Sequence, residues 1–175
     1  MRSSIVFLSF LMTLATTAFA QVESFKTVDY VDRDRFMGAW YVQAGRFTPL
    51  EKDVTNALEK YTWNNEKKSI KIDFSYNQGS FQGPVKKIPQ TGYIQDKTNA
   101  HWKISPLWPL KFDYLIVALD PDYQWTAIGV PSQKYLWVMT REAQFPKERL
   151  EQVLKEIEAV GYPVDNLTIV PQQKR

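Results

Sequence analysis

Eight short β-rich runs follow one another from Gly38 onward, and they restrict the possible folds more than any other feature of the chain. Each run is rich in β-branched and aromatic residues, and clusters of turn-forming residues such as Asn, Asp, Gly, Pro and Ser separate them. The runs are residues 40–47, 56–63, 69–76, 84–95, 100–104, 113–118, 125–130 and 135–140. This spacing predicts an all-β domain, an eight-stranded antiparallel up-and-down barrel.

One segment after the last run has the period of an α-helix. Its apolar residues recur at intervals of three and four: Leu150, Val153, Leu154, Ile157 and Val160. Pro146 stands near the expected start and Gly161 near the expected end. The opposite face carries mixed charges and leans acidic, whereas a helix lying on a membrane favours basic residues there. We therefore expect one C-terminal α-helix packed outside the barrel, followed by a short strand at 167–170.

Residues 1–20 have the pattern of a cleaved secretory signal peptide. Arg2 supplies a positive charge, residues 5–17 are apolar but short for a membrane span, and Ala18-Phe19-Ala20 matches the cleavage pattern. We expect the mature chain to begin at Gln21 and to form a single domain over 21–175, a length sufficient to bury a core. A retained anchor helix is the alternative.

Composition excludes several kinds of site. The chain has 22 Lys and Arg against 19 Asp and Glu, evenly spread, which is too balanced for a nucleic-acid partner. It has no cysteine, so disulfides, thiolate metal sites, Cys nucleophiles and a lipid-anchor Cys after the signal peptide are all excluded. Aromatic residues make up 14% of the chain, which favours β-structure, a large apolar cavity, or both.

Three motifs stand in order along the chain: Gly38-Ala39-Trp40-Tyr41, residues 117–123 with Asp120, and residues 136–141. They resemble motifs of the lipocalin family, in particular its bacterial lipocalin and apolipoprotein D branch. The first is similar to the family's G-x-W-Y motif and the second to its middle motif. Residues 136–141, which end in Arg141, resemble its last-strand motif. The order and spacing of the three match the family, and the resemblance runs from about Tyr30 to Val170.

The resemblance implies that the outer motifs close the base of the barrel. Trp40 begins the first strand and Arg141 ends the last, so guanidinium and indole can stack there, a contact worth about 0.5–2 kcal/mol. Gly38 allows a tight approach to the first strand. We expect Gly38, Trp40, Asp120 and Arg141 to act in barrel closure and not in contact with a ligand.

Strand parity and the resemblance together predict a lining for the barrel. If Arg141 points inward, Met139 and Trp137 do so as well, and Val42 shares the parity of Trp40. The resemblance adds Tyr61, Phe74, Tyr76, Leu115 and Val117. For any one of these side chains, ordinary packing of the barrel wall is the alternative.

A proline-broken apolar segment joins the fifth and sixth runs and resembles an exposed loop of bacterial lipocalins. Residues 105–110 read Ser-Pro-Leu-Trp-Pro-Leu, where a polar turn would suffice. Exposed Leu107 and Trp108 would contact membrane lipid or a partner chain. The alternative, that Trp108 folds back over the barrel rim, remains open.

No catalytic constellation is evident, so we expect neither an enzyme nor a cofactor. His101 is the single histidine and has no cysteine to join it, so no metal site is expected. An enzyme of this fold acting on a bound lipid or isoprenoid is the alternative from another class. An integral outer-membrane barrel is disfavoured because polar residues 171–175 end the chain after a helix.

The expected function is the binding and carriage of a small hydrophobic ligand, a fatty acid or lysophospholipid, in the cell envelope. No positive clamp for a buried carboxylate is evident, which favours a headgroup at the mouth. The resemblance implies a role in membrane maintenance or stress. The signal peptide and missing anchor Cys predict a soluble protein in the periplasm of a bacterium with an outer membrane, as a monomer or weak homodimer.

Overall fold

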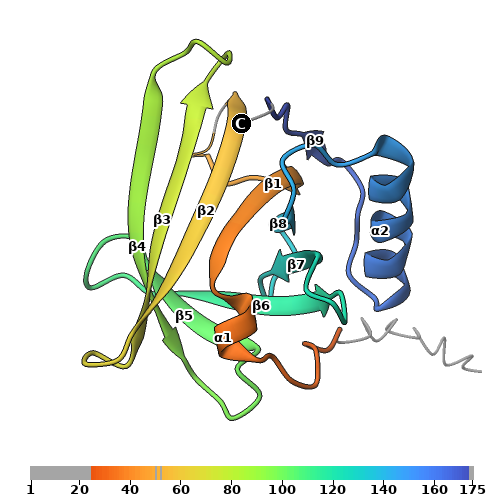
Figure 1. Cartoon of the computed structure of the whole chain (residues 1–175). Coiled ribbons are helices and arrows are strands. Elements are labelled where there is room, and N and C mark those ends of the chain that lie inside the picture. Colours follow the sequence, from red (N-terminus) through yellow and green to blue (C-terminus); the bar gives the residue numbers. More distant parts are fainter. Residues whose placement is uncertain (1–24, 50, 52, 174–175) are drawn as a thin grey trace, which may run out of the picture.

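All eight predicted runs form strands of one antiparallel sheet that closes on itself (Figure 1). The computed structural model describes residues 25–49, 51 and 53–173, so the expected signal peptide lies outside the described residues. The strands are β1 (Gly38–Arg46), β2 (Val54–Asn64), β3 (Ser69–Gln78), β4 (Val85–Ile94), β5 (His101–Ser105), β6 (Phe112–Leu119), β7 (Trp125–Gly129), β8 (Leu136–Thr140) and β9 (Thr168–Ile169). Two helices, α1 (Arg33–Phe36) and α2 (Lys147–Ala159), complete the described elements.

The strand order defines an up-and-down barrel. Strands β2 to β8 follow one another in sequence, β8 pairs with β1, and β1 pairs again with β2. The predicted fold class, eight antiparallel strands in a closed barrel with one C-terminal helix, is therefore confirmed. Since connections alternate between the two ends of such a barrel, the β2–β3, β4–β5 and β6–β7 turns share the base with α1. The β1–β2, β3–β4, β5–β6 and β7–β8 connections share the opposite end, called the mouth below.

The last closure, between β1 and β2, covers only part of the two strands. Gly38–Tyr41 pair with residues 58–61, and beyond them β9 takes over as the partner of β1. The segment after β9 then reaches β2, because the Asn56 N–H donates to the Pro171 carbonyl at 2.8 Å. The Gln172 side-chain amide donates to the carbonyls of Val42 and Ala57, at 2.7 and 2.9 Å. The C-terminal segment thus bridges the upper part of the seam between the strands.

Helix α2 lies outside the ring of strands, as predicted (Figure 1). Its buried residues Leu150, Val153 and Ile157 belong to an outer apolar cluster with residues of β6, β7 and β8. Full burial of such side chains contributes roughly 1.5–3 kcal/mol each. Gly129 is required in this layer, since a Cβ there would lie 2.4 Å from the Tyr162 ring. The helix therefore covers one wall of the barrel and leaves the interior free of its side chains.

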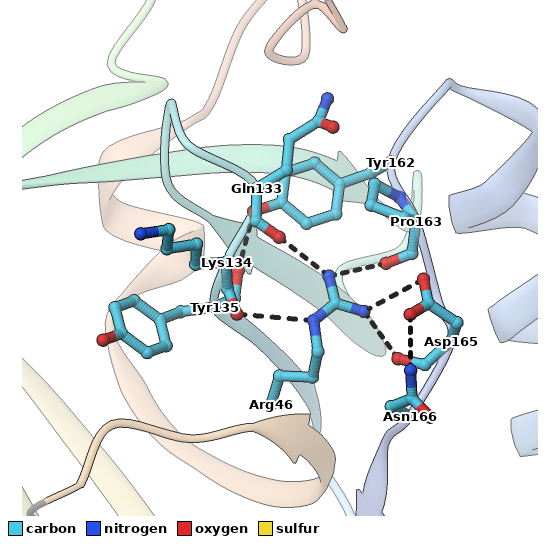
Figure 2. Close-up of polar contacts among 8 residues, drawn as sticks. All are labelled: Arg46, Gln133, Lys134, Tyr135, Tyr162, Pro163, Asp165 and Asn166. Atoms are coloured by element: carbon cyan, nitrogen blue, oxygen red, sulfur yellow. Dashed lines mark hydrogen bonds and ion pairs between the residues drawn. The ribbon is translucent and has the colours of Figure 1, made fainter.

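Arg46, at the end of β1, fastens the segment after α2 to the barrel (Figure 2). Its guanidinium donates to the carbonyls of Gln133, Pro163 and Asp165 at 2.9, 3.0 and 2.7 Å. The Asp165 carboxylate lies 3.6 Å away. One guanidinium therefore joins β1, the β7–β8 connection and the approach to β9, with the planar fork that arginine alone provides.

Candidate functional site

Trp40 and Arg141 close the base of the barrel. The Arg141 guanidinium lies 3.7 Å from the centre of the Trp40 ring and donates to the carbonyls of Ala39, Arg35 and Phe36 at 2.9, 2.6 and 3.2 Å. The Trp40 indole N–H donates to the Phe36 carbonyl at 2.8 Å, so α1 is part of the same plug. Burial lowers the pKa of Arg141 to about 10, so the side chain stays charged at neutral pH.

Gly38 and Asp120, which were also predicted to act in barrel closure, shape the backbone beside this plug. Gly38 has φ of +98°, a conformation that residues with a Cβ rarely adopt. The Asp120 carboxylate accepts from the N–H groups of Asp122 and Gln124 at 3.1 and 3.0 Å, which orders the β6–β7 turn. The Asp120 carboxylate thus acts through the turn and not by direct contact with Trp40 or Arg141.

The structure brings six of the eight predicted lining residues together in one inner cluster. Val42, Tyr61, Phe74, Tyr76 and Met139 are buried in it, and Trp137 is half-buried against it. These residues come from β1, β2, β3 and β8, so the cluster reaches across the sheet. The inner wall is therefore apolar and aromatic over much of its surface.

The other two predicted lining residues lie on the wrong side of the wall. Leu115 and Val117 belong to the outer cluster beneath α2, so their prediction as inward-facing residues is wrong. From the same strand, Tyr114 and Ile116 pack in the inner cluster instead. A shift of one residue exchanges the two faces of a strand, and β6 also changes register between Ile116 and Ala118.

Sequence reasoning missed an aromatic floor above the Trp40 plug. Trp102 on β5 stacks on Tyr114 of β6, with ring centres 5.2 Å apart and planes 9° from parallel. Phe36 and Tyr61 meet Trp102 edge-on, at 5.3 and 5.9 Å. The alternation of polar and apolar residues along 101–105 could have indicated Trp102. The four rings come from α1, β2, β5 and β6, so their meeting depends on elements far apart in the sequence.

Sequence reasoning also missed a buried carboxyl in this wall. Glu59 of β2 is 5% exposed and lies opposite Trp40 of β1 and Phe74 of β3 in the strand register. The Tyr61 hydroxyl donates to the Glu59 carboxyl and also contacts the Tyr114 hydroxyl. Burial raises the pKa of Glu59 to about 7, the Tyr61 hydrogen bond opposes that rise, and Glu51 adds to it. Burial and the neighbouring acidic groups likewise hold the pKa values of Tyr61 and Tyr114 well above 10.

At the mouth, Glu51 of the β1–β2 connection is held by three donors. The Trp137 indole N–H donates to Glu51 Oε1 at 2.9 Å, while the Thr48 N–H and hydroxyl donate to Oε2 at 3.1 and 2.7 Å. A pocket of about 510 Å³ lies beside this connection, lined also by Phe47 and by Pro171 of the C-terminal bridge. The mouth is therefore bordered by the carboxylates of Glu51 and Asp53 and by aromatic rings.

The β5–β6 loop projects its apolar side chains into solvent. Trp108 is 83% exposed and Leu107 70% exposed, with Leu110 and Phe112 also exposed beside them. Trp108 therefore does not fold back over the rim, and its contact with membrane lipid or a partner chain stays a prediction. Lys111 of the same loop lies 5.0 Å from the centre of the Tyr93 ring, so the loop combines a cation with its apolar residues.

His101 sits at an ion-pair site on the barrel wall. Its Nε2 lies 2.7 Å from the Asp113 carboxylate, which Lys103 also meets at 2.6 Å. These two partners lower the pKa of Asp113. Within the described ranges, no group of three or more His, Asp or Glu side chains has the spacing to hold a metal ion. The helices described here are also too short or too polar to cross a membrane.

A barrel with a plugged base, an apolar and aromatic inner wall and a helix outside defines a class of small hydrophobic ligand-binding proteins. A family model described as a lipocalin-like domain matches residues 31–172. The chain belongs to the lipocalin family, as its three sequence motifs indicated.

Two curated relatives support the same assignment. Temperature-induced lipocalin-1 of Arabidopsis thaliana is 30% identical, over 79% of this chain and 78% of the relative. Outer membrane lipoprotein Blc of Vibrio cholerae is 22% identical, over 96% of this chain and 98% of the relative. Among solved structures, insecticyanin from the tobacco hornworm Manduca sexta has a TM-score of 0.63 at 15% identity, covering 85% of each chain, which is a likeness of fold.

Proposed function

We propose that this protein binds and carries a fatty acid or a lysophospholipid in the bacterial cell envelope. The observation that carries the proposal is the inner wall, where Val42, Phe74, Tyr76, Trp137 and Met139 gather in one apolar cluster above the base plug. Burying an acyl chain against such a wall contributes about 0.8 kcal/mol for each methylene. Lipocalins are in general binding proteins, which agrees with a carrier.

The charges of the barrel favour a ligand whose headgroup stays at the mouth. Glu59 is buried in the inner wall and Glu51 accepts from Trp137 at the mouth, while Arg141 at the base is occupied by backbone carbonyls and Trp40. A buried fatty-acid carboxylate would therefore lack a positive partner, at a large desolvation cost. A lysophospholipid head, or a carboxylate in contact with water, avoids that cost.

Two observations support a place in the envelope. The similar Blc proteins are named outer membrane lipoproteins, and the first twenty residues have the pattern of a secretory signal. The exposed loop of Leu107, Trp108, Leu110 and Phe112 provides an apolar surface, and Lys111 provides a charge that suits anionic lipid. We propose that the protein is exported and contacts membrane lipid through this loop.

Native lipid analysis tests the proposal. The exported protein is purified from a periplasm without detergent, extracted, and its lipids are identified by mass spectrometry; the delipidated protein is then titrated with stearic acid and lysophosphatidylethanolamine. The expected result is one acyl lipid per chain and saturable quenching of tryptophan fluorescence.

A pair of variants locates the binding. Trp137→Ala, on the inner wall, should weaken acyl-lipid binding roughly tenfold or more while circular dichroism stays unchanged. Tyr93→Ala, on an outward-facing position, is the matched control and should bind as the unaltered protein does. Absence of co-purified lipid together with no saturable response to either lipid would overturn the proposal.

A further inference from the structure

Three polar side chains meet inside the inner wall. The Tyr61 hydroxyl joins the Glu59 carboxyl to the Tyr114 hydroxyl, so one hydrogen-bonded chain runs from β2 to β6. Glu59 and Tyr61 are buried, and the aromatic rings of Trp40, Trp102 and Phe74 belong to the same cluster. This cluster is distinct from the base plug, whose guanidinium donates to backbone carbonyls.

Barrel closure does not explain a carboxyl at this place. Apolar residues of similar size usually stabilise a core as well as or better than a buried ionisable group. The base is already sealed by Arg141 and Trp40, and the β1–β2 pairing at Trp40 and Glu59 uses only backbone groups. Glu59 therefore carries a desolvation cost that the fold itself does not require.

The carboxyl has capacity left for another hydrogen bond. Among the described residues, Glu59 accepts a side-chain hydrogen bond from Tyr61, whereas a carboxyl offers about four acceptor positions or, when protonated, a donor as well. The titratable groups around it are Tyr61 on β2, Tyr114 on β6 and Glu51 at the mouth. The Arg141 guanidinium also acts on Tyr61, but backbone carbonyls and the Trp40 ring occupy it, so a neutral partner suits the site better than a carboxylate.

We propose that Glu59, Tyr61 and Tyr114 form an internal subsite for a hydroxyl group on the buried part of an acyl ligand, so that the barrel selects hydroxylated chains. This inference rests on the proposed acyl-lipid binding. A hydroxyl is the matching group because it can donate to Glu59 and accept from a tyrosine hydroxyl at the same time. Without these partners, a buried hydroxyl would cost free energy in so apolar a wall.

The position of Glu59 along β2 indicates which part of the acyl chain would carry the hydroxyl that the subsite binds. Glu59 is the sixth residue of the strand that begins with Val54. With a rise of about 3.3 Å per residue and a typical strand tilt, it lies roughly 13 Å below the start of β2. An acyl chain with its head at the mouth reaches that depth with its middle carbons, and the carbons beyond them must turn back from the aromatic floor that Tyr61 and Tyr114 help to form. The subsite should therefore bind a mid-chain hydroxyl and make no contact with one beside the head.

A comparison of three ligands tests the subsite. The purified, delipidated protein is titrated with stearic acid, 2-hydroxystearic acid and 12-hydroxystearic acid by isothermal calorimetry. The 12-hydroxy acid should bind more tightly than stearic acid, and the 2-hydroxy acid should show no such gain. In Glu59→Leu, the 12-hydroxy acid should lose roughly tenfold relative to stearic acid, because its hydroxyl is buried unpaired.

Further variants exclude a loss of structure as the cause. Glu59→Gln retains an acceptor and a donor and should retain the preference, Tyr114→Phe should weaken it, and the exposed Glu66→Leu should leave it unchanged. If Glu59→Leu does not fold, the subsite is tested by comparing Tyr114→Phe, which should weaken the preference for the 12-hydroxy acid, with Glu59→Gln, which should retain it. An equal ratio of the affinities for the 12-hydroxy acid and stearic acid in the unaltered protein and in Tyr114→Phe would overturn the subsite while stearic acid still binds. Failure of all three acids and of lysophosphatidylethanolamine to bind would instead overturn the proposed function.

Discussion

The Trp137 indole N–H donates to the Glu51 carboxylate at 2.9 Å, which ties strand β8 to the connection between β1 and β2 at the mouth. Thr48 donates twice to the other oxygen of the same carboxylate. Trp137, which has the largest side chain among the predicted lining residues, therefore has a second role. It also positions the β1–β2 connection that borders the mouth.

Trp137→Phe should loosen this connection while keeping an aromatic wall. Loss of a hydrogen bond to a charged acceptor costs about 1.5–3 kcal/mol when the acceptor stays buried, and less when water replaces the donor. We expect the free energy of unfolding to fall by roughly 1–2 kcal/mol and amide exchange to rise in residues 47–53. Trp63→Phe removes a comparable indole bond, to the exposed Asn65, and should change both quantities far less. Equal protection of residues 47–53 in the two variants would contradict the assigned role.

Glu59→Gln should stabilise the protein at alkaline pH. The folded-state pKa of Glu59 is raised to about 7 from 4.5, so the folded protein holds a proton that the unfolded chain releases. Stability from this group is therefore complete below pH 4.5 and declines as the pH rises through 7. At about 1.36 kcal/mol per pKa unit, the unaltered protein should lose about 2–3 kcal/mol relative to Glu59→Gln between pH 5 and pH 8.

Urea unfolding at the two pH values measures that difference. The exposed Glu148→Gln on α2 is the matched control, and its stability should follow the pH curve of the unaltered protein because Glu59 is still present. A Glu59→Gln variant whose stability follows the same pH curve as the unaltered protein would show that the Glu59 carboxyl titrates outside this range.

Arg141→Lys should weaken the base of the barrel despite retaining the charge. Lysine cannot span the carbonyls of Ala39, Arg35 and Phe36 with one planar group, nor stack as a guanidinium does on Trp40. We expect a loss of about 2–3 kcal/mol in the free energy of unfolding, measured with urea. Arg149→Lys, on the exposed face of α2, should stay within about 0.5 kcal/mol.

Trp108→Ser should reduce binding to vesicles of phosphatidylethanolamine and phosphatidylglycerol. The indole is 83% exposed, so the fold should be unaffected, while the loss of its transfer into lipid should lower the vesicle partition coefficient roughly tenfold. Flotation or surface plasmon resonance provides the measurement. Tyr30→Ser is the control, because Tyr30 is 62% exposed and lies toward the opposite end, where the neighbouring Val31 bonds to the β4–β5 turn. Equal losses from both variants would mean that the β5–β6 loop does not direct membrane contact.

Local patterns in the sequence were sufficient for the elements of the fold. Alternation and turn residues located all eight strands to within a few residues, and the three-and-four spacing from Leu150 located α2. These signals succeed because strand and helix periods depend on neighbouring residues along one chain. The inward direction of Tyr61, Phe74 and Met139 followed from the same alternation and the family resemblance.

Relationships between strands were decided by the tertiary structure. Leu115 and Val117 face α2 because the pairing of β6 with its neighbours and the register change after Ile116 select which face is buried inside. Its residue type favours the surface for Glu59, although it shares the face of Tyr61 in β2, and the β1–β2 and β2–β3 registers set it opposite Trp40 and Phe74. The sequence by itself determined where the strands and the helix lie, because that information is local. Register, closure and the burial of one carboxyl were determined only when distant strands met, because each depends on what lies across the barrel.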